Sequence, residues 1–284
     1  MKKYIKITAL LLLGSNIFHS CSKDYLEQDD KQNLTENTFW TTRQHALQGI
    51  TATYAALQGH DGSKWTFFEE MYTTLAYKGD DIKNNTNEPY GKSLAAFTNG
   101  ADESGPWNLW ASCYAGIGRA NQVIEKVPGI KVMTEQERNE IVGEAKFLRA
   151  YNYFILVNGF ENVPLVLKFE KDINKLQVPQ AAATAVWAQI EKDLMEAEQV
   201  LPSSYPAEYR GRATKGAAKA LTGKAYLYQE KWPLAETKFK EIVGQYSLNS
   251  NYIDNFNGLS ENGSESVFEI QFSGDRSVSD ERHP

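Results

Sequence analysis

The chain has 284 residues, which is enough for one large or two small domains at roughly 150 residues per domain. Its 36 acidic residues outnumber its 30 basic ones, and no basic run longer than two follows the N-terminus. Nucleic acid is therefore excluded as an expected partner, because phosphate backbones are bound by concentrated positive charge.

The first 20 residues carry the pattern of a signal peptide. Lys2, Lys3 and Lys6 form a positive start, and an apolar run follows at 7–13. This run is far shorter than the roughly 20 residues that span a bilayer, and no later segment comes close, so no transmembrane helix is expected. We expect residues 1–20 to be removed as the signal.

Cys21 stands where signal cleavage would occur. It resembles the processing site of a lipoprotein, whose cysteine receives fatty acyl chains such as palmitate and becomes the new N-terminus. Phe18 and His19 depart from the usual residues before such a cysteine, whereas Ser20 fits. A plain secretory signal with an incidental cysteine is the alternative. We expect lipidation at Cys21 and a polar tether at 21–40, because several acyl chains on one residue anchor a protein firmly.

Apolar residues recur three or four positions apart from about residue 41 onward, which predicts helices and a mostly α fold. Irregular loops are expected at 79–91 and 202–212, where Gly, Asn and Pro interrupt both helix and strand. We expect helices at about 42–57, 64–77, 107–127, 134–158, 184–201, 214–229 and 233–246. Thr134 and Glu137 have the spacing of a capping box at the start of the fourth helix.

The stretch GEAKFLRAYNYF at 143–154 crowds aromatic residues around Arg149. A ring-shaped ligand is one explanation and packing is the other. Apolar residues form two stripes on this helix, which is typical of a helix held between neighbours. We therefore expect packing, with Arg149 reaching past its own stem to a carboxylate or to carbonyl groups at a helix end.

The helix pair at 214–246 fits the template of a tetratricopeptide unit, which is about 34 residues long. Gly223, Tyr226, Ala235 and Phe239 take its small and aromatic positions, although the first Trp and the closing Pro are missing. Helices of similar length with short connections favour a stack of helical hairpins. A short β element is expected near the C-terminus, because SESVFEIQF at 264–272 alternates apolar and polar residues.

Catalytic and metal-binding patterns are weak throughout the sequence. The four histidines are scattered without metal-ligand spacing. Asp80 and Asp81 begin an oxygen-rich loop that would suit calcium, but the EF-hand spacing fails and a solvated acidic loop is favoured. Glu69 and Glu70 add carboxylates, yet sugar hydrolysis needs two carboxyl groups at a set separation across a cleft. We expect no catalysis, no metal and no cofactor, with a glycoside hydrolase as the minority alternative.

Four stretches carry a family resemblance: CSKDYLEQ, WNLWASCYAGIGRANQVIEKV, GEAKFLRAYNYFILVNGFENVPLVL and RATKGAAKALTGKAYLY, which begin at residues 21, 107, 143 and 212. Their combination and order resemble the SusD/RagB family of nutrient-binding surface lipoproteins. The resemblance implies tetratricopeptide-like hairpins that support a loop-rich part, here at 41–284. Family members are roughly twice as long, so we expect the carboxyl half of the pattern to be absent and the remaining stack to expose apolar surface and dissolve poorly.

The resemblance also implies a function. The protein would bind a glycan or another nutrient at the cell surface, stay in the outer membrane through its lipid, and deliver its ligand to a SusC-like TonB-dependent transporter without catalysis. A tetratricopeptide-like scaffold lipoprotein for envelope assembly is the alternative, and the repeat pattern supports it equally well.

Aromatic and amide side chains near loop ends are the candidates for glycan binding, since planar rings stack on sugars and amides bind hydroxyl groups in pairs. These candidates are Trp65, Tyr90, Trp107 and Asn108. Packing explains Trp65 and Trp107 as well as binding does.

Two other pairs of aromatic residues are assigned differently. Trp110 and Tyr114 share a helical stripe with Ile117 and are expected in the core. Tyr205 and Tyr209 lie in the irregular loop at 202–212, and they would face the transporter instead of the glycan.

Overall fold

The computed structural model describes residues 36–58, 71–80, 89–100, 103–258 and 260–272. The chain divides into two compact units, residues 1–39 and 40–284. The first unit contains one described element, the short helix α3 (Glu36–Phe39). The predicted signal peptide, Cys21 and most of the predicted tether lie outside the described residues.

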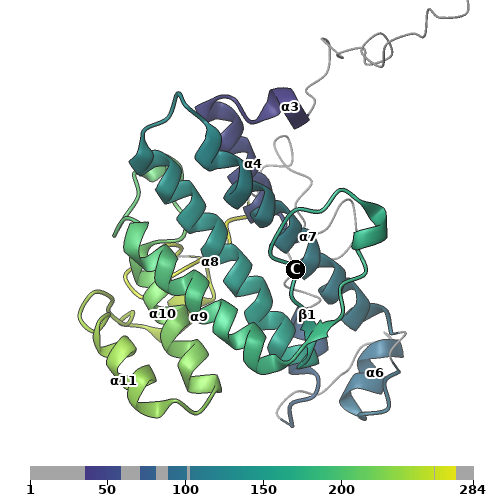
Figure 1. Cartoon of the computed structure of the whole chain (residues 1–284). Helices are drawn as coiled ribbons and strands as arrows, with labels where there is room; N and C mark the ends of the chain where they lie inside the picture. Colours follow the sequence, from purple (N-terminus) through teal and green to yellow (C-terminus); the bar gives the residue numbers. More distant parts are fainter. Residues whose placement is uncertain (1–35, 59–70, 81–88, 101–102, 259, 273–284) are drawn as a thin grey trace, which may run out of the picture. The chain divides into compact units, whose positions relative to one another are not determined.

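The second unit is mostly helical, as predicted (Figure 1). Two short strands, β1 (Val163–Pro164) and β2 (Gln180–Ala181), pair antiparallel with Val163 opposite Ala181. The described residues of this unit form the α-helices α4 (Arg43–Ala55), α6 (Pro89–Ala95), α7 (Ser104–Lys126), α8 (Glu135–Phe160), α9 (Ala183–Val200), α10 (Lys215–Tyr228) and α11 (Trp232–Lys240). A π-helical turn (Tyr72–Ala76) and short 3-10 turns at Val127–Gly129, Ile173–Lys175, Ala207–Tyr209 and Tyr252–Asn255 lie in the connections.

Side-chain caps fix where three of these helices begin. The hydroxyl groups of Thr42 and Thr214 accept backbone N–H hydrogen bonds at the starts of α4 and α10. At the start of α8, Thr134 accepts from the backbone of Glu137, and the Glu137 carboxylate accepts the Thr134 N–H at 2.9 Å. The predicted capping box is therefore confirmed, and it satisfies backbone donors that a first turn leaves unpaired.

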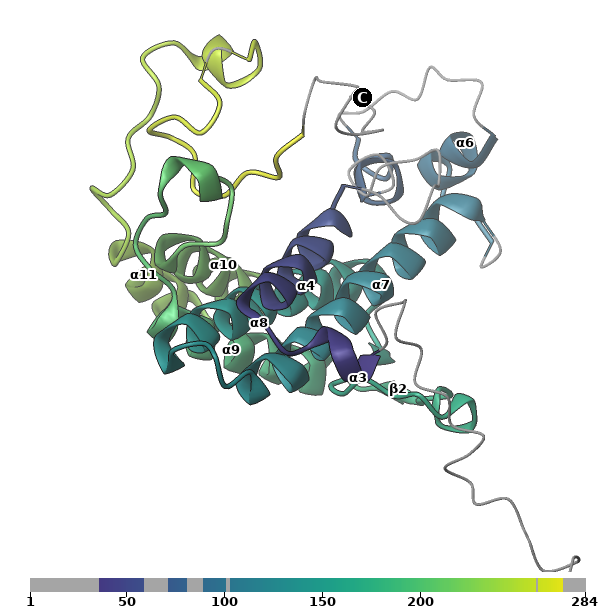
Figure 2. The ribbon, with the colours of Figure 1, turned by 90° about the horizontal axis from the view of Figure 1, so that it is seen from above.

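Helix α8 packs against α4, α7 and α9, and Figure 2 shows it among these neighbours. Large apolar side chains on most of its circumference are buried, and each contributes about 1.5–3 kcal/mol to folding. They include Phe147, Leu148, Tyr153, Phe154 and Leu156. The stretch at 143–154 is thus a packing element, as predicted.

Helices α10 and α11 form the hairpin that the tetratricopeptide spacing predicts. Gly223 faces the Phe239 ring so closely that a Cβ atom on it would lie 2.6 Å from the ring. Ala235 is buried on the facing side of the hairpin. Small residues at these two positions let the helices approach, because interiors are packed without spare room.

The predicted strand at 264–272 is wrong in detail. Residues 264–272 run without strand pairing, and among the described residues the strands are β1 and β2 alone. Alternation of side chains fixes which residues face the core, and Phe268 does pack against Phe147 with ring centroids 5.0 Å apart. A strand also needs a second backbone for its ladder of hydrogen bonds, and periodicity cannot supply one.

One boundary also differs from the prediction, and one helix was not predicted. Helix α11 ends at Lys240 rather than near 246, and Gly244 in the following turn has a φ of 82°, which no right-handed helix contains. Helix α6 (Pro89–Ala95) was not predicted, and it begins inside the predicted loop at 79–91, because proline suits a first helical turn. Of the predicted helix at 64–77, residues 64–70 lie outside the described part of the chain.

Candidate functional site

Trp107 lies in the first turn of α7, and 65% of it is exposed. Its backbone N–H donates to the Glu103 carbonyl at 3.2 Å, so the ring stands on ordered helix rather than on a loop. Trp110, one turn further on, packs edge-on against Phe160 with ring centroids 5.1 Å apart. The helix therefore turns one tryptophan outward and the next inward, and the predicted core assignment of Trp110 is confirmed.

Helix α6 is attached to the start of α7, and both views place the two side by side (Figures 1 and 2). The Ser93 hydroxyl of α6 donates to the Glu103 carboxylate at 2.7 Å. Tyr90 belongs to the first turn of α6, and Asn108 is half-buried next to Trp107. Two elements that carry predicted binding residues thus meet at one end of α7.

Two of the four predicted binding residues cannot be placed in full. Trp65 lies outside the described residues, and so does the side chain of Tyr90. Trp107 and Asn108 are adjacent in α7, and the exposed Trp107 ring is the feature of this group that a ligand can reach.

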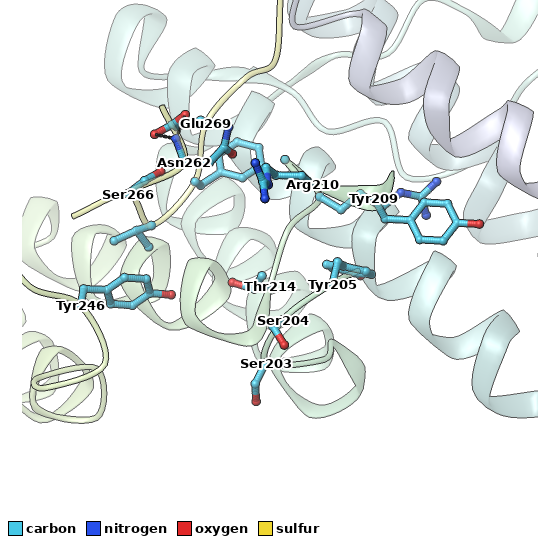
Figure 3. A pocket seen from close by; sticks show the side chains of 14 residues that line it. Ser203, Ser204, Tyr205, Tyr209, Arg210, Thr214, Tyr246, Asn262, Ser266 and Glu269 are labelled. Carbon is cyan, nitrogen blue, oxygen red and sulfur yellow. Dashed lines mark hydrogen bonds between the residues drawn. The ribbon is translucent and has the colours of Figure 1, made fainter. Parts of the chain in front are cut away.

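A pocket of about 240 Å³ opens beside the irregular loop at 202–212. Figure 3 shows Tyr205 and Tyr209 on one side of it, with Tyr246 and Asn262 on the other. Its remaining lining is Ser203, Ser204, Arg210, Gly211, Arg212, Thr214, Ser266, Val267, Phe268 and Glu269. Sequence reasoning found the two loop tyrosines but missed the opposite wall, which comes from residues 246–269 and gives no local motif.

The base of this loop is held by a buried carboxylate. Glu144 of α8 is 1% exposed, and it accepts hydrogen bonds from the Tyr54 hydroxyl at 2.8 Å and from Arg212 Nη1 at 3.1 Å. The Tyr54 hydroxyl in turn accepts the Ala213 N–H at 2.8 Å. Burial raises the pKa of Glu144 to about 7, although Arg212 and Tyr54 favour its charged form. The group fixes the loop to α4 and α8 but has no open path to a substrate.

The polar groups in the far wall of the pocket are largely paired within the chain. Both oxygens of the Glu269 carboxylate accept the Asn262 N–H, at 3.0 and 2.9 Å. The Asn262 side chain exchanges hydrogen bonds with Gln271 at 2.9 and 3.2 Å. Gly211 has a φ of 86°, and a Cβ atom there would lie 2.3 Å from Gln271 Cγ, so the two chain segments touch. The wall is therefore built mainly by internal contacts, and it offers few polar groups to a small ligand.

Arg149 does not belong to either surface. Its guanidinium group binds Asp193 of α9 through two hydrogen bonds of 2.7 and 2.8 Å. It also donates to the Asn121 side chain at 2.8 Å and to the Leu167 carbonyl at 3.3 Å. The predicted reach of Arg149 to a carboxylate is confirmed, and the pair joins α7, α8 and α9 inside the core.

The described residues contain no group of three or more His, Cys, Asp or Glu side chains arranged to hold a metal ion. In the same part of the chain, no helix is both long and apolar enough to cross a membrane.

Comparison with known proteins matches residues 24–227 to the SusD-like family described as "Starch-binding associating with outer membrane". The SusD-like protein P25 of Formosa agariphila is 28% identical over 95% of this chain and 53% of its own length.

Solved structures agree with this match. A laminarin-binding SusD-like protein is 30% identical with a TM-score of 0.68, covering 80% of this chain and 51% of the other. A SusD superfamily protein from Bacteroides vulgatus is 25% identical with a TM-score of 0.72, covering 81% and 50%. The chain therefore spans about half the length of these relatives.

Proposed function

Because this chain belongs to the SusD-like family, described as starch-binding and associated with the outer membrane, we propose that it captures oligosaccharides at the cell surface and passes them unchanged to a SusC-like TonB-dependent transporter. No catalytic step is part of this role.

The exposed ring of Trp107 is the observation that carries the proposal. A tryptophan on ordered helix presents a flat apolar face at little entropic cost, and such faces bind the apolar side of a sugar ring. Tyr90 in the adjoining helix α6 would add a second ring, and Asn108 would bind hydroxyl groups with its amide. Trp65 completes the proposed set.

Laminarin is the first ligand to test, because a solved relative at 30% identity is a laminarin-binding protein. Isothermal titration calorimetry of the chain with laminarin and with starch oligosaccharides would measure binding. We expect Trp107→Ala to weaken binding at least tenfold, which corresponds to a loss of about 1.4 kcal/mol of stacking.

Trp232→Ala is the matched control. Trp232 is 56% exposed on α11, which lies away from α6 and the start of α7 (Figure 1). Its replacement should leave sugar affinity unchanged. Equal binding by wild type and Trp107→Ala for every oligosaccharide that binds would refute the site. A chain that binds no sugar but retains an envelope protein would favour the scaffold function, and release of reducing ends would favour a hydrolase.

Attachment to the outer membrane is proposed to occur through lipid on Cys21. Cells expressing the chain would be labelled with a palmitate analogue and fractionated. We expect the label and the protein in the outer-membrane fraction, and both should leave that fraction in a Cys21→Ser variant.

A further inference from the structure

Phe97 follows the last turn of α6, and 70% of it is exposed. Its φ is 55°, in the left-handed region that a bulky side chain seldom occupies. In the described part of the chain, positive φ values outside glycine occur also at Glu161, Glu230 and Asn262, none of which is aromatic. At Phe97, an exposed ring thus stands on a strained backbone.

Hydrogen bonds at the end of α6 impose this backbone conformation. The Thr98 N–H donates to the Ser93 carbonyl at 2.9 Å, and the Phe97 N–H donates to the Leu94 carbonyl at 3.1 Å. This is the Schellman pattern, in which the residue at position 97 turns left-handed and glycine is usual because it has no Cβ atom. Helix α6 would therefore end in the same way, and with less strain, if glycine replaced Phe97.

The packing of α6 makes little use of the Phe97 ring. Leu94 of the same helix is fully buried, whereas most of the Phe97 ring lies in water. Exposure of an apolar ring and left-handed strain each oppose folding, and burial of the ring offsets neither. A strained residue whose side chain stays in solvent indicates a role in binding rather than in folding.

Phe97 and Trp107 are attached to the same pair of residues. The Ser93 hydroxyl donates to the Glu103 carboxylate at 2.7 Å, and the Trp107 N–H donates to the Glu103 carbonyl at 3.2 Å. The turn that carries Phe97 is closed on the Ser93 carbonyl. Because α6 lies beside the start of α7 (Figures 1 and 2), both exposed rings stand on ordered backbone at this end of α7.

We propose that Phe97 is a further ligand-contacting residue of the oligosaccharide site, and that its ring stacks on the apolar C–H face of a sugar unit. The left-handed turn holds the ring in solvent at the end of α6. A phenyl ring has no polar atom, so it adds affinity for a sugar ring without choosing among hydroxyl groups. This inference rests on the proposed function of Trp107, and it adds a residue that sequence reasoning missed.

Three substitutions separate the ring from the strain. Isothermal titration calorimetry would use the same laminarin and starch oligosaccharides as for Trp107→Ala. Phe97→Leu keeps an apolar side chain and the strain but removes the ring, and it should weaken binding about fivefold or more. Phe97→Tyr keeps the ring and should bind within about twofold of wild type. Phe97→Gly should weaken binding as Phe97→Leu does, yet raise the melting temperature by about 2–4 °C because the strain is relieved.

Glu230→Gly is the matched control for the strain. Exposed Glu230 ends α10 in the same pattern: its φ is 58°, its N–H donates to the Leu227 carbonyl at 3.0 Å, and the Lys231 N–H donates to the Tyr226 carbonyl at 2.9 Å. Its replacement should raise the melting temperature by a similar amount and leave sugar affinity unchanged.

The outcomes distinguish this inference from the proposed function. Weakened binding by Trp107→Ala with unchanged binding by Phe97→Leu and Phe97→Gly would overturn the role of Phe97 alone. A lower melting temperature for Phe97→Gly, where Glu230→Gly gains, would assign the ring to packing and overturn it as well. If wild type binds none of these sugars, the proposed function and the role of Phe97 both fail.

Discussion

Removing the carboxylate of Asp193 should destabilise the fold more than most single changes. Arg149 and Asp193 are 5% and 1% exposed, and two hydrogen bonds join them. Asp193→Ala would leave the guanidinium group buried with the Asn121 oxygen and the Leu167 carbonyl as its remaining partners. Neither partner carries a negative charge.

The size of the effect follows from the loss of two charge-assisted hydrogen bonds and from a buried, uncompensated charge. Breaking a buried ion pair from one side costs about 3–5 kcal/mol. At about 2–4 °C per kcal/mol for a domain of this size, the melting temperature should fall by roughly 6–20 °C. Urea unfolding followed by circular dichroism would give the free energy, and a thermal melt would give the temperature.

Two controls separate the buried charge from the loss of a contact. Glu236→Ala removes an equally short contact, 2.6 Å to Lys240, but both groups are exposed and the melting temperature should hardly move. Arg149→Met combined with Asp193→Leu removes both charges and should recover most of the lost stability. A cost below about 1 kcal/mol for Asp193→Ala would refute the claim that this pair holds α8 to α9.

Three further changes test other parts of the fold. Because burial raises the pKa of Glu144 from 4.5 to about 7, its folded state binds the proton more tightly. Its contribution to the free energy of unfolding is therefore complete below pH 4.5 and is lost as the pH rises through 7, by up to about 3 kcal/mol. Urea titrations between pH 5 and 8 would measure this loss. Glu144→Gln should make the free energy of unfolding depend less on pH over that range. Gly223→Ala should cost about 1–3 kcal/mol, because its methyl group meets the Phe239 ring. A Cβ atom on Gly118 in α7 would have no other atom within 4 Å, so Gly118→Ala should raise the melting temperature, since alanine favours helix by about 1 kcal/mol relative to glycine. Equal changes in melting temperature for the two substitutions would contradict the packing argument.

Features set by local sequence were predictable. The period of apolar residues located the helices, and Thr134 with Glu137 gave the start of α8, because a capping box is complete within four residues. The small residues of the α10–α11 hairpin were also predictable, because their spacing is contained within one short stretch of sequence. Helix α6 and the end of α11 were not predicted, because they depend on single turns that Pro89 and Gly244 set.

For features that depend on residues distant in the sequence, the type of partner could be predicted but not which residue provides it. Arg149 needed an acceptor because a buried guanidinium group cannot stay unpaired, but nothing local names Asp193, which lies 44 residues away. The pocket in Figure 3 joins a loop near 205 to a segment near 265, and only the fold brings them together. The segment at 264–272 shows the same limit, since its alternation specifies a strand face without specifying a partner.

The buried and the exposed residues singled out in this chain have different roles: the buried ones hold the fold together, and the exposed one can contact a ligand. The stretch at 143–154, which carries the family resemblance, is used for packing: Glu144 fixes the loop at 202–212, and Arg149 fixes α9. Such residues constrain the frame and say nothing of the ligand, because they do not reach solvent. Trp107 reaches solvent from the first turn of a helix that this frame holds. Changes at Arg149 should therefore lower the free energy of unfolding without altering which ligand is preferred. Changes at Trp107 should alter the preference among ligands and leave the free energy of unfolding unchanged.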